Sequence, residues 1–378
     1  MRILLLLIFS LLVLTVSTTL SQTTAKDYFD RGNEHKKAGK LSEAAEDYAR
    51  AIELDENFAM AYFELGDLNM RNKQYADAII DFTKTIQLDP TNSRAYAERA
   101  FSYSAIYKSD EAFKDADKAI ELNPALAEAY YTRGVARYAS HDARGALPDL
   151  DRAIELGLAT PAAYMHRGVV RDATDDFLGG IVDLTRAIEL DPKYVRAYGN
   201  RAIARRSYGD YSGAVADYTK MLEFDQKDKY SVLGRAWTRV FMNDASGAYK
   251  DALQYITMDG HNEGDAAFAA AIAYIALRKS DRPTEAKDFL NGFLRKPNVS
   301  DWGTQIVRFL AGQLTESQLF EIAGKDDGKL TDAHGFVGVK YLLDGDQQGA
   351  RTHFQWDREN GSHSHIAHQL ARTEFARM

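Results

Sequence analysis

The sequence repeats with a period of 34 residues, and this period constrains the fold more than any other feature. The eighth position of each repeat is glycine or alanine, and the fourth is tyrosine in the first six repeats. Apolar residues recur at helical spacing in both halves of a repeat, with a polar turn between them. One such hairpin of two helices cannot bury its apolar faces alone, so the copies must stack. The seven repeats begin at Ala25, Ala59, Ser93, Ala127, Pro161, Val195 and Lys229.

Prolines mark the ends of several repeats. Pro90, Pro124 and Pro192 stand at the same place in repeats 2, 3 and 5, where proline cannot continue a helix. Pro148 departs from this pattern because it lies inside the second helix of repeat 4. There it predicts a bent helix or a shortened helix start.

The pattern resembles the tetratricopeptide repeat, whose 34-residue helix-turn-helix units stack into a right-handed superhelix. The resemblance extends from Ala25 to about Asn262. It departs at position seven, where leucine is usual and arginine mostly stands here. The resemblance implies an all-α fold, a right-handed α-solenoid of stacked hairpins with a C-terminal capping helix. It also implies a protein that binds other proteins or extended peptides in a concave groove.

After repeat 7 the 34-residue phase weakens. Residues 263–296 predict a degenerate eighth hairpin, in which Ser280 to Pro283 form a lengthened turn. Residues 297–378 predict a helix led by Trp302, a short helix capped by Thr315, a final hairpin at about 332–357 and a closing helix at about 365–378. A terminal helix of this kind would cover the apolar face of the last full repeat.

The order of these C-terminal elements resembles bacterial envelope tetratricopeptide proteins. These include an outer-membrane lipoprotein that docks proteases and cell-wall hydrolases. The chain has no cysteine, so the lipid-modified cysteine of that lipoprotein is missing and attachment by lipid does not carry over. The absence of cysteine also excludes disulfides and thiolate zinc sites.

The first 21 residues have the layout of a secretory signal peptide. A charged end at Arg2 precedes the apolar run from Ile3 to Val16, and small or hydroxylated residues follow up to Ser21. We expect cleavage after Ser21 and a protein that is exported, either to the periplasm or to the outside. The alternative is an uncleaved anchor, because residues 3–20 carry no charge.

Charge and motifs narrow the function classes further. The formal net charge of −8 argues against nucleic-acid binding, which normally requires a basic patch. No phosphate-binding glycine loop, metalloprotease motif or nucleophile elbow occurs, so we expect no cofactor, no resident metal and no enzyme activity. The sequence leaves open whether the chain forms a homodimer.

Arginine and aspartate form a ladder at fixed repeat positions. Arginine recurs at positions seven and eleven of the first helices, and aspartate stands at position twenty-three of all seven repeats. We interpret this ladder as structural ion pairs that set the register of the repeats. The alternative is an arginine-lined track for an anionic peptide or glycan. The ladder residues are Arg99, Arg133, Arg167, Arg201 and Arg235, with Asp115, Asp149, Asp183, Asp217 and Asp251.

The concave surface of the family is lined by outward positions of each first helix. Exposed aromatic and aliphatic side chains there would suit an extended peptide or a partner helix. The alternative is that several are buried between repeats. The predicted groove residues are Phe29, Asn33, Phe63, Asp67, Phe101, Tyr131, Val135, Met165, Val169 and Ile203.

The family also has a clamp for C-terminal carboxylates, built from lysine and asparagine. Asn33 fits that clamp, but Phe29, Glu64 and Glu98 stand where a cation or an amide is expected. A receptor for chaperone tails is therefore disfavoured.

A histidine cluster lies near the C-terminus. His353, His363, His365 and His368 are close in sequence to Asp357 and Glu359, which could supply oxygen ligands. We interpret the cluster as surface polar residues rather than a metal site.

These observations predict a non-enzymatic scaffold or adaptor of the cell envelope that binds partner proteins in its groove. The alternatives are a binder of anionic glycan or cell-wall ligands through the arginines, and an accessory enzyme of a hydrolase.

Overall fold

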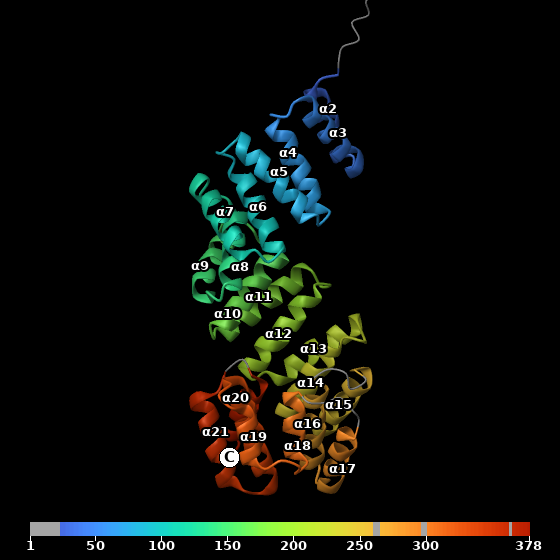
Figure 1. The fold of residues 1–378 in the computed structure, drawn as a ribbon, viewed down its shortest axis with the longest axis vertical. Helices are drawn as coiled ribbons and strands as arrows, with labels where there is room; N and C mark the ends of the chain where they lie inside the picture. Colours follow the sequence, from blue (N-terminus) through green and yellow to red (C-terminus); the bar gives the residue numbers. More distant parts are fainter. Residues whose placement is uncertain (1–22, 260–264, 296–300, 363–364) are drawn as a thin grey trace, which may run out of the picture. The chain divides into compact units, whose positions relative to one another are not determined.

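The computed structural model describes residues 23–259, 265–295, 301–362 and 365–378, and all regular structure in these residues is helical (Figure 1). The chain divides into two compact units, residues 1–159 and 160–378, which we call the N-terminal and the C-terminal unit. The predicted signal peptide lies outside the described residues. No helix of the described segments is long and apolar enough to cross a membrane.

The N-terminal unit consists of four helical hairpins, and each first helix begins at the first residue of its repeat. Within each hairpin the two helices pack along their length, and the second helices of the first three hairpins also pack on the first helix of the next hairpin. The hairpins are α2 (Ala25–Lys37) with α3 (Leu41–Leu54), α4 (Ala59–Arg71) with α5 (Tyr75–Leu88), α6 (Ser93–Ala105) with α7 (Ser109–Leu122), and α8 (Ala127–Ala139) with α9 (Ala143–Glu155).

Small residues at position eight allow the two helices of a hairpin to approach closely. A Cβ atom at Gly66 would lie 2.8 Å from the ring of Phe82 on the second helix, which is too close for any larger residue without a shift. The following turn places its position-fifteen residue in the left-handed region, at a φ of 75° for Gly39 and 62° for Tyr107. Three residues therefore suffice to reverse the chain.

The C-terminal unit continues with hairpins of the same kind and adds a block of shorter helices. Repeats 5 to 7 form α10 (Pro161–Ala173) with α11 (Phe177–Leu190), α12 (Val195–Tyr208) with α13 (Tyr211–Phe224), and α14 (Lys229–Phe241) with α15 (Ala245–Asp259). The rest of the unit is α16 (Asp265–Lys279), α17 (Pro283–Leu294), α18 (Trp302–Leu310), α19 (Glu316–Ala323), α20 (Asp327–Asp344), α21 (Gln347–Asn360) and α22 (Ile366–Phe375).

The final hairpin repeats the geometry of the earlier ones. Gly338 on α20 faces Phe354 on α21, sixteen residues later, as Gly66 faces Phe82. Gly345 occupies the left-handed turn position with a φ of 89°. The hairpin of α20 and α21 is therefore built like a repeat, although position twenty-three holds His353 instead of aspartate.

One local prediction was wrong, and one alternative of a second did not occur. The turn between α16 and α17 comprises residues 280–282 and is as short as the other turns, because Pro283 serves as the first residue of α17. Pro148 does not shorten the start of α9, which begins at Ala143, the position where the other second helices begin. Instead α9 ends one residue early, and Gly157 follows with a φ of 103°.

Candidate functional site

The arginines at position seven bind the aspartates of their own hairpins. In five hairpins the arginine Nε and Nη2 atoms donate to the two carboxylate oxygens at 2.6–3.0 Å, a bidentate geometry. The five aspartates are at most 8% exposed. The pairs are Arg99–Asp115, Arg133–Asp149, Arg167–Asp183, Arg201–Asp217 and Arg235–Asp251.

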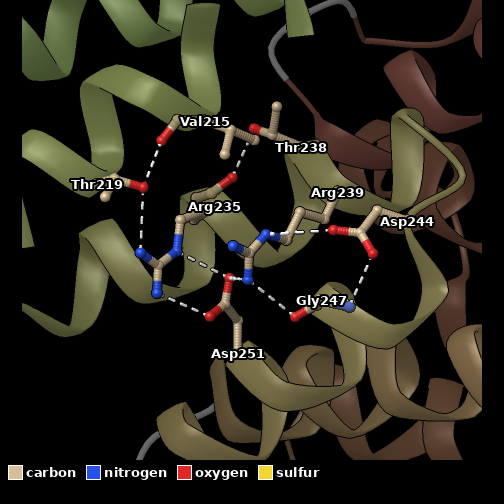
Figure 2. Close-up of polar contacts among 9 residues, drawn as sticks. Val215, Thr219, Arg235, Thr238, Arg239, Asp244, Gly247 and Asp251 are labelled. Carbon is tan, nitrogen blue, oxygen red and sulfur yellow. Dashed lines mark hydrogen bonds and ion pairs between the residues drawn. The ribbon is translucent and has the colours of Figure 1, made fainter. Parts of the chain in front are cut away.

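A second arginine, at position eleven, binds the same carboxylate in hairpins 4 to 7. Figure 2 shows this arrangement in the seventh hairpin, where Nη1 of Arg239 donates to Asp251 at 2.7 Å and to the carbonyl oxygen of Gly247 at 3.2 Å. Asp244 lies 3.5 Å from Nε of Arg239 and accepts from the amide of Gly247 at 2.9 Å, so it also caps α15. The arginine thus connects both helices and the turn of one hairpin.

The arginines at position seven also connect consecutive hairpins. Nη1 of Arg235 donates to Thr219 of the preceding second helix at 3.2 Å (Figure 2), and Arg133 reaches Asp117 at 2.7 Å in the same way. The tyrosine at position four lies under the guanidinium, as at Tyr130, whose ring centre is 5.5 Å from Arg133. Because the arginines are engaged inside the protein, this geometry favours a structural role over a track for anions.

Repeat 2 shows what happens where the arginine is missing. Position seven is Leu65, and Asp81 receives one hydrogen bond from Asn69 at 2.8 Å. Burial raises the pKa of Asp81 to about 6. In repeat 1, by contrast, hydrogen bonds from Arg31 hold the pKa of Asp47 below its ordinary value, despite a smaller opposing effect of burial.

The first helices of consecutive hairpins lie against one another, α4 against α6 and α6 against α8. Their outward side chains form one surface, which we call the N-terminal face and define by Phe63, Asp67, Glu98 and Phe101, with Tyr131 and Val135 of α8. Phe101 is 37% exposed, and Phe63, Tyr131 and Val135 are half-buried. The N-terminal unit therefore presents aromatic side chains to solvent along this face.

Several predicted groove residues do not lie on an exposed surface. Phe29 is 7% exposed and packs against the rings of Tyr48 and Phe58, and Met165 is 1% exposed in the core of the C-terminal unit. Both were wrongly expected to point outward; they fill space between helices instead. Asn33 accepts a hydrogen bond from the hydroxyl of Tyr48 at 2.8 Å, and Val169 is half-buried against the same core as Met165.

Charged side chains surround the aromatic residues of the N-terminal face. Asp67 accepts from Lys36 at 2.6 Å and forms an ion pair with Arg71 at 3.0 Å, and Lys36 also reaches Glu64 at 2.5 Å. The guanidinium of Arg94 lies 5.2 Å from the ring centre of Phe63. The face is thus both aromatic and charged.

Glu98 differs from the other acids of this face because no hydrogen bond or ion pair to its carboxylate occurs among the described residues. Burial, with the negative charges of Asp67 and Glu128, raises its pKa to about 7, although Arg94 and Arg71 oppose the shift. Sequence reasoning noted Glu98 as a departure from the carboxylate clamp, but it did not predict an unpaired acid. Whether Glu98 has a bonded partner depends on how α4, α6 and α8 pack together, and the sequence pattern of one helix does not show this.

In the C-terminal unit, the chain's own C-terminal helices pack against the first helices. The ring of Phe336 on α20 lies 6.1 Å from Trp237 on α14 and 6.0 Å from Phe268 on α16. Gln369 on α22 donates to the carbonyl oxygen of Arg206 at 2.8 Å, close to the end of α12. Figure 1 shows α20 beside these first helices. We call α20 and α22 the C-terminal cover.

Further bonds hold α22 in this place. Lys279 at the end of α16 binds Glu374 at 2.8 Å, and Tyr211 at the start of α13 contacts Thr373 at 3.1 Å. A cleft of about 620 Å³ remains between α22, α10 and α12. Ile203, the last predicted groove residue, lines this cleft with Asp172 and is 39% exposed.

The histidines are not the surface cluster that we expected. His353 and His368 are 7% and 3% exposed. His368 pairs with the buried Asp357 at 2.9 Å, His365 pairs with Asp332 at 3.2 Å, and His353 contacts His334 at 3.0 Å. These three histidines are therefore packing residues within the C-terminal helices, and His363 lies outside the described residues. No group of three potential metal ligands occurs among the described residues.

Comparison with known proteins agrees with this geometry. Residues 29–93 match the family model described as the tetratricopeptide repeat. The same spacing, small residue and hairpin geometry recur in the later repeats, which therefore share the architecture of the matched residues.

Solved structures with similar folds have low identity. A tetratricopeptide repeat protein from Parabacteroides merdae is 18% identical with a TM-score of 0.47, over 66% of this chain and 98% of that one. PilW, a type IV pilus biogenesis factor, is 19% identical with a TM-score of 0.48, over 53% and 92%. YrrB, described as having an unusual peptide-binding site, is 20% identical with a TM-score of 0.41, over 50% and 96%.

Proposed function

We propose that this protein is a non-enzymatic scaffold or adaptor that binds partner proteins or extended peptides on its N-terminal face. The observation that carries the proposal is the contrast between the two units. In the C-terminal unit, α20 and α22 pack on the first helices, whereas in the N-terminal unit Phe101 of α6 is 37% exposed, with its ring 6.5 Å from that of Tyr75. Exposed aromatic side chains on a continuous surface are typical of protein interfaces.

The alternative of an arginine-lined site for anionic glycan has less support. Arg99, Arg201 and Arg235 are at most 16% exposed in their side chains and bind aspartates in a bidentate manner. A ligand would have to displace those carboxylates, which would leave a buried charge unpaired at a cost of about 3–5 kcal/mol.

We also propose that the chain is exported and acts in the cell envelope, with residues 1–21 as a cleaved signal peptide. The support is the charged, apolar and small-residue order of that segment. N-terminal sequencing of the protein from its native host should begin near Gln22. A start at Met1 would favour the uncleaved anchor.

The binding proposal is tested by recovery of partners from native envelope extract. Phe63→Ala combined with Phe101→Ala should abolish recovery, because interface aromatics contribute on the order of 2 kcal/mol each. The matched control is Ile80→Ala on α5, a second-helix residue that is 67% exposed. Recovery that survives the double substitution in a protein with an unchanged melting temperature would exclude the N-terminal face.

A further inference from the structure

Charge is distributed unevenly between the two units. Residues 23–159 contain 25 acidic and 18 basic side chains, a formal charge of −7, whereas residues 160–378 contain 30 and 28. The unit that presents the N-terminal face therefore carries almost all of the chain's net negative charge. Such a field attracts cationic segments and repels acidic ones.

The cations of the N-terminal face are already engaged. Lys36 lies between Glu64 and Asp67, Arg71 is bound to Asp67, and Arg94 lies over the ring of Phe63. Among the acids, Glu98 alone combines partial burial with the lack of a bonded partner in the described part of this face. A carboxylate in that position gains from an incoming cation more than an exposed carboxylate does, because water solvates it poorly.

Glu98 and Phe101 stand three residues apart on α6, so their side chains lie on neighbouring parts of the same helix surface. Glu98 also experiences the charges of Asp67 and Arg71 on α4 and of Glu128 on α8. A guanidinium or ammonium group beside Glu98 would thus have an exposed aromatic ring next to it. This combination suits a basic residue with apolar neighbours.

We propose, on the basis of the proposed function, that the partner segment is an extended peptide in which apolar residues flank a lysine or arginine. The cation of this peptide pairs with Glu98, and its apolar residues contact Phe63 and Phe101. The field of the N-terminal unit selects such a segment over an acidic one. Glu98 provides the specific contact, and the aromatic residues provide the apolar contact area.

The proposal also predicts proton release on binding. An arriving cation favours the ionised carboxylate, so a proton leaves Glu98 when the peptide binds near pH 7. The charged groups around Glu98 are Asp67 and Arg71 on α4, Arg94 on its own helix and Glu128 on α8. Affinity should therefore rise as pH increases from about 6 to about 8, and Glu98→Gln should remove the dependence.

The test uses the mature full-length chain and three labelled peptides that share one sequence of serine and leucine. The peptides differ only at two central positions, which hold arginine in the first, glutamine in the second and glutamate in the third. In fluorescence anisotropy the arginine peptide should bind at least about tenfold more tightly than the glutamine peptide, and the glutamate peptide should bind more weakly still. Glu98→Gln should weaken the arginine peptide about tenfold, and Phe101→Ala should also weaken it.

The control variant is Glu121→Gln, which removes the same charge from an exposed position on the second helix α7. It should leave the affinity within about twofold. Equal effects of Glu98→Gln and Glu121→Gln would overturn the proposal, because only the general field would then matter. Preference for the glutamate peptide would overturn it as well.

Failure of this inference is distinguishable from failure of the proposed function. If no peptide binds, but native partner recovery is lost in the Phe63→Ala, Phe101→Ala variant, the basic-segment proposal is wrong and the scaffold proposal stands. If native recovery also survives that variant, both are wrong.

Discussion

The guanidinium of Arg201 holds both oxygens of Asp217 across one hairpin, with Nε and Nη2 donating at 3.0 and 2.7 Å. The carboxylate is buried, with 3% of the residue exposed. The arginine's remaining Nη1 reaches Thr185 of the preceding hairpin at 3.0 Å. One side chain therefore fixes the packing within a repeat and the register between two repeats.

Removing this aspartate should destabilise the protein strongly. Asp217→Ala removes the one carboxylate that binds both Arg201 and Arg205, and Arg205 donates to it at 2.8 Å. We expect a loss of about 3–5 kcal/mol in the free energy of unfolding, because a buried charge loses its partner. Chemical denaturation monitored by circular dichroism measures this change.

The matched control lies on the same helix. Glu223→Ala breaks the ion pair with Lys220. The side chains of Lys220 and Glu223 are 45% and 60% exposed, so the substitution should lower the free energy of unfolding by less than about 1 kcal/mol. Similar losses in both variants would mean that the ladder contributes no more than a surface ion pair.

Asp81→Asn should stabilise the protein in a pH-dependent way. The folded-state pKa of Asp81 is raised by burial to about 6, above its ordinary value of 3.8, so ionisation is easier in the unfolded chain. The free energy of unfolding therefore falls as pH rises from about 4 to about 6, because Asp81 ionises in the unfolded chain first. Above that range the cost of the buried charge is fully present. Asparagine carries no charge and can still accept the hydrogen bond from Asn69.

We therefore expect Asp81→Asn to add about 1–2 kcal/mol at pH 7.5, a value reduced from the full shift for solvent screening, and almost nothing at pH 4. Denaturation curves at the two pH values measure the difference. A variant that is less stable than the wild type at pH 7.5 would contradict this assignment of the charge penalty.

Helix α22 should loosen when its close contact with α20 is widened. A Cβ atom at Gly335 on α20 would lie 2.9 Å from Cβ of Ala367 on α22, so Gly335→Leu cannot be accommodated without moving α22. Hydrogen exchange in residues 366–375 should become markedly faster in this variant.

Gly292→Leu on α17 is the control, because the space around its Cβ is open. It should leave exchange in α22 unchanged. Protection of α22 that persists in Gly335→Leu would show that α22 is held by other contacts, such as that of Glu374 with Lys279.

The repeated part of the fold was predictable because its signals are local. The period, the small eighth residue and the turn lie within one hairpin, and the helix starts at Ala59 and Ser93 follow from them. The ladder was predictable for the same reason, since Arg99 and Asp115 face each other inside one hairpin.

The remainder depends on contacts between residues that are far apart in sequence. Trp237 contacts Phe336 because the C-terminal helices pack back against the first helices, and no periodic pattern in the sequence predicts that packing. Packing among α19 to α22 buries His353 against Phe320 and His334, and His368 against Asp357, although both histidines lie near the end of the chain in sequence. Phe29 and Met165 were misplaced because an outward position on one helix becomes an inner position once the next hairpin stacks on it.

The most direct test of the scaffold account is site-specific photo-crosslinking in the native host. A photoreactive phenylalanine at position 101 should crosslink to a partner protein, and the same residue at Ile80 on α5 should not. Both positions are exposed, so reactivity alone does not distinguish them. Crosslinks at position 101 that disappear in the Phe63→Ala background are the predicted result, and crosslinks confined to position 80 would contradict the account.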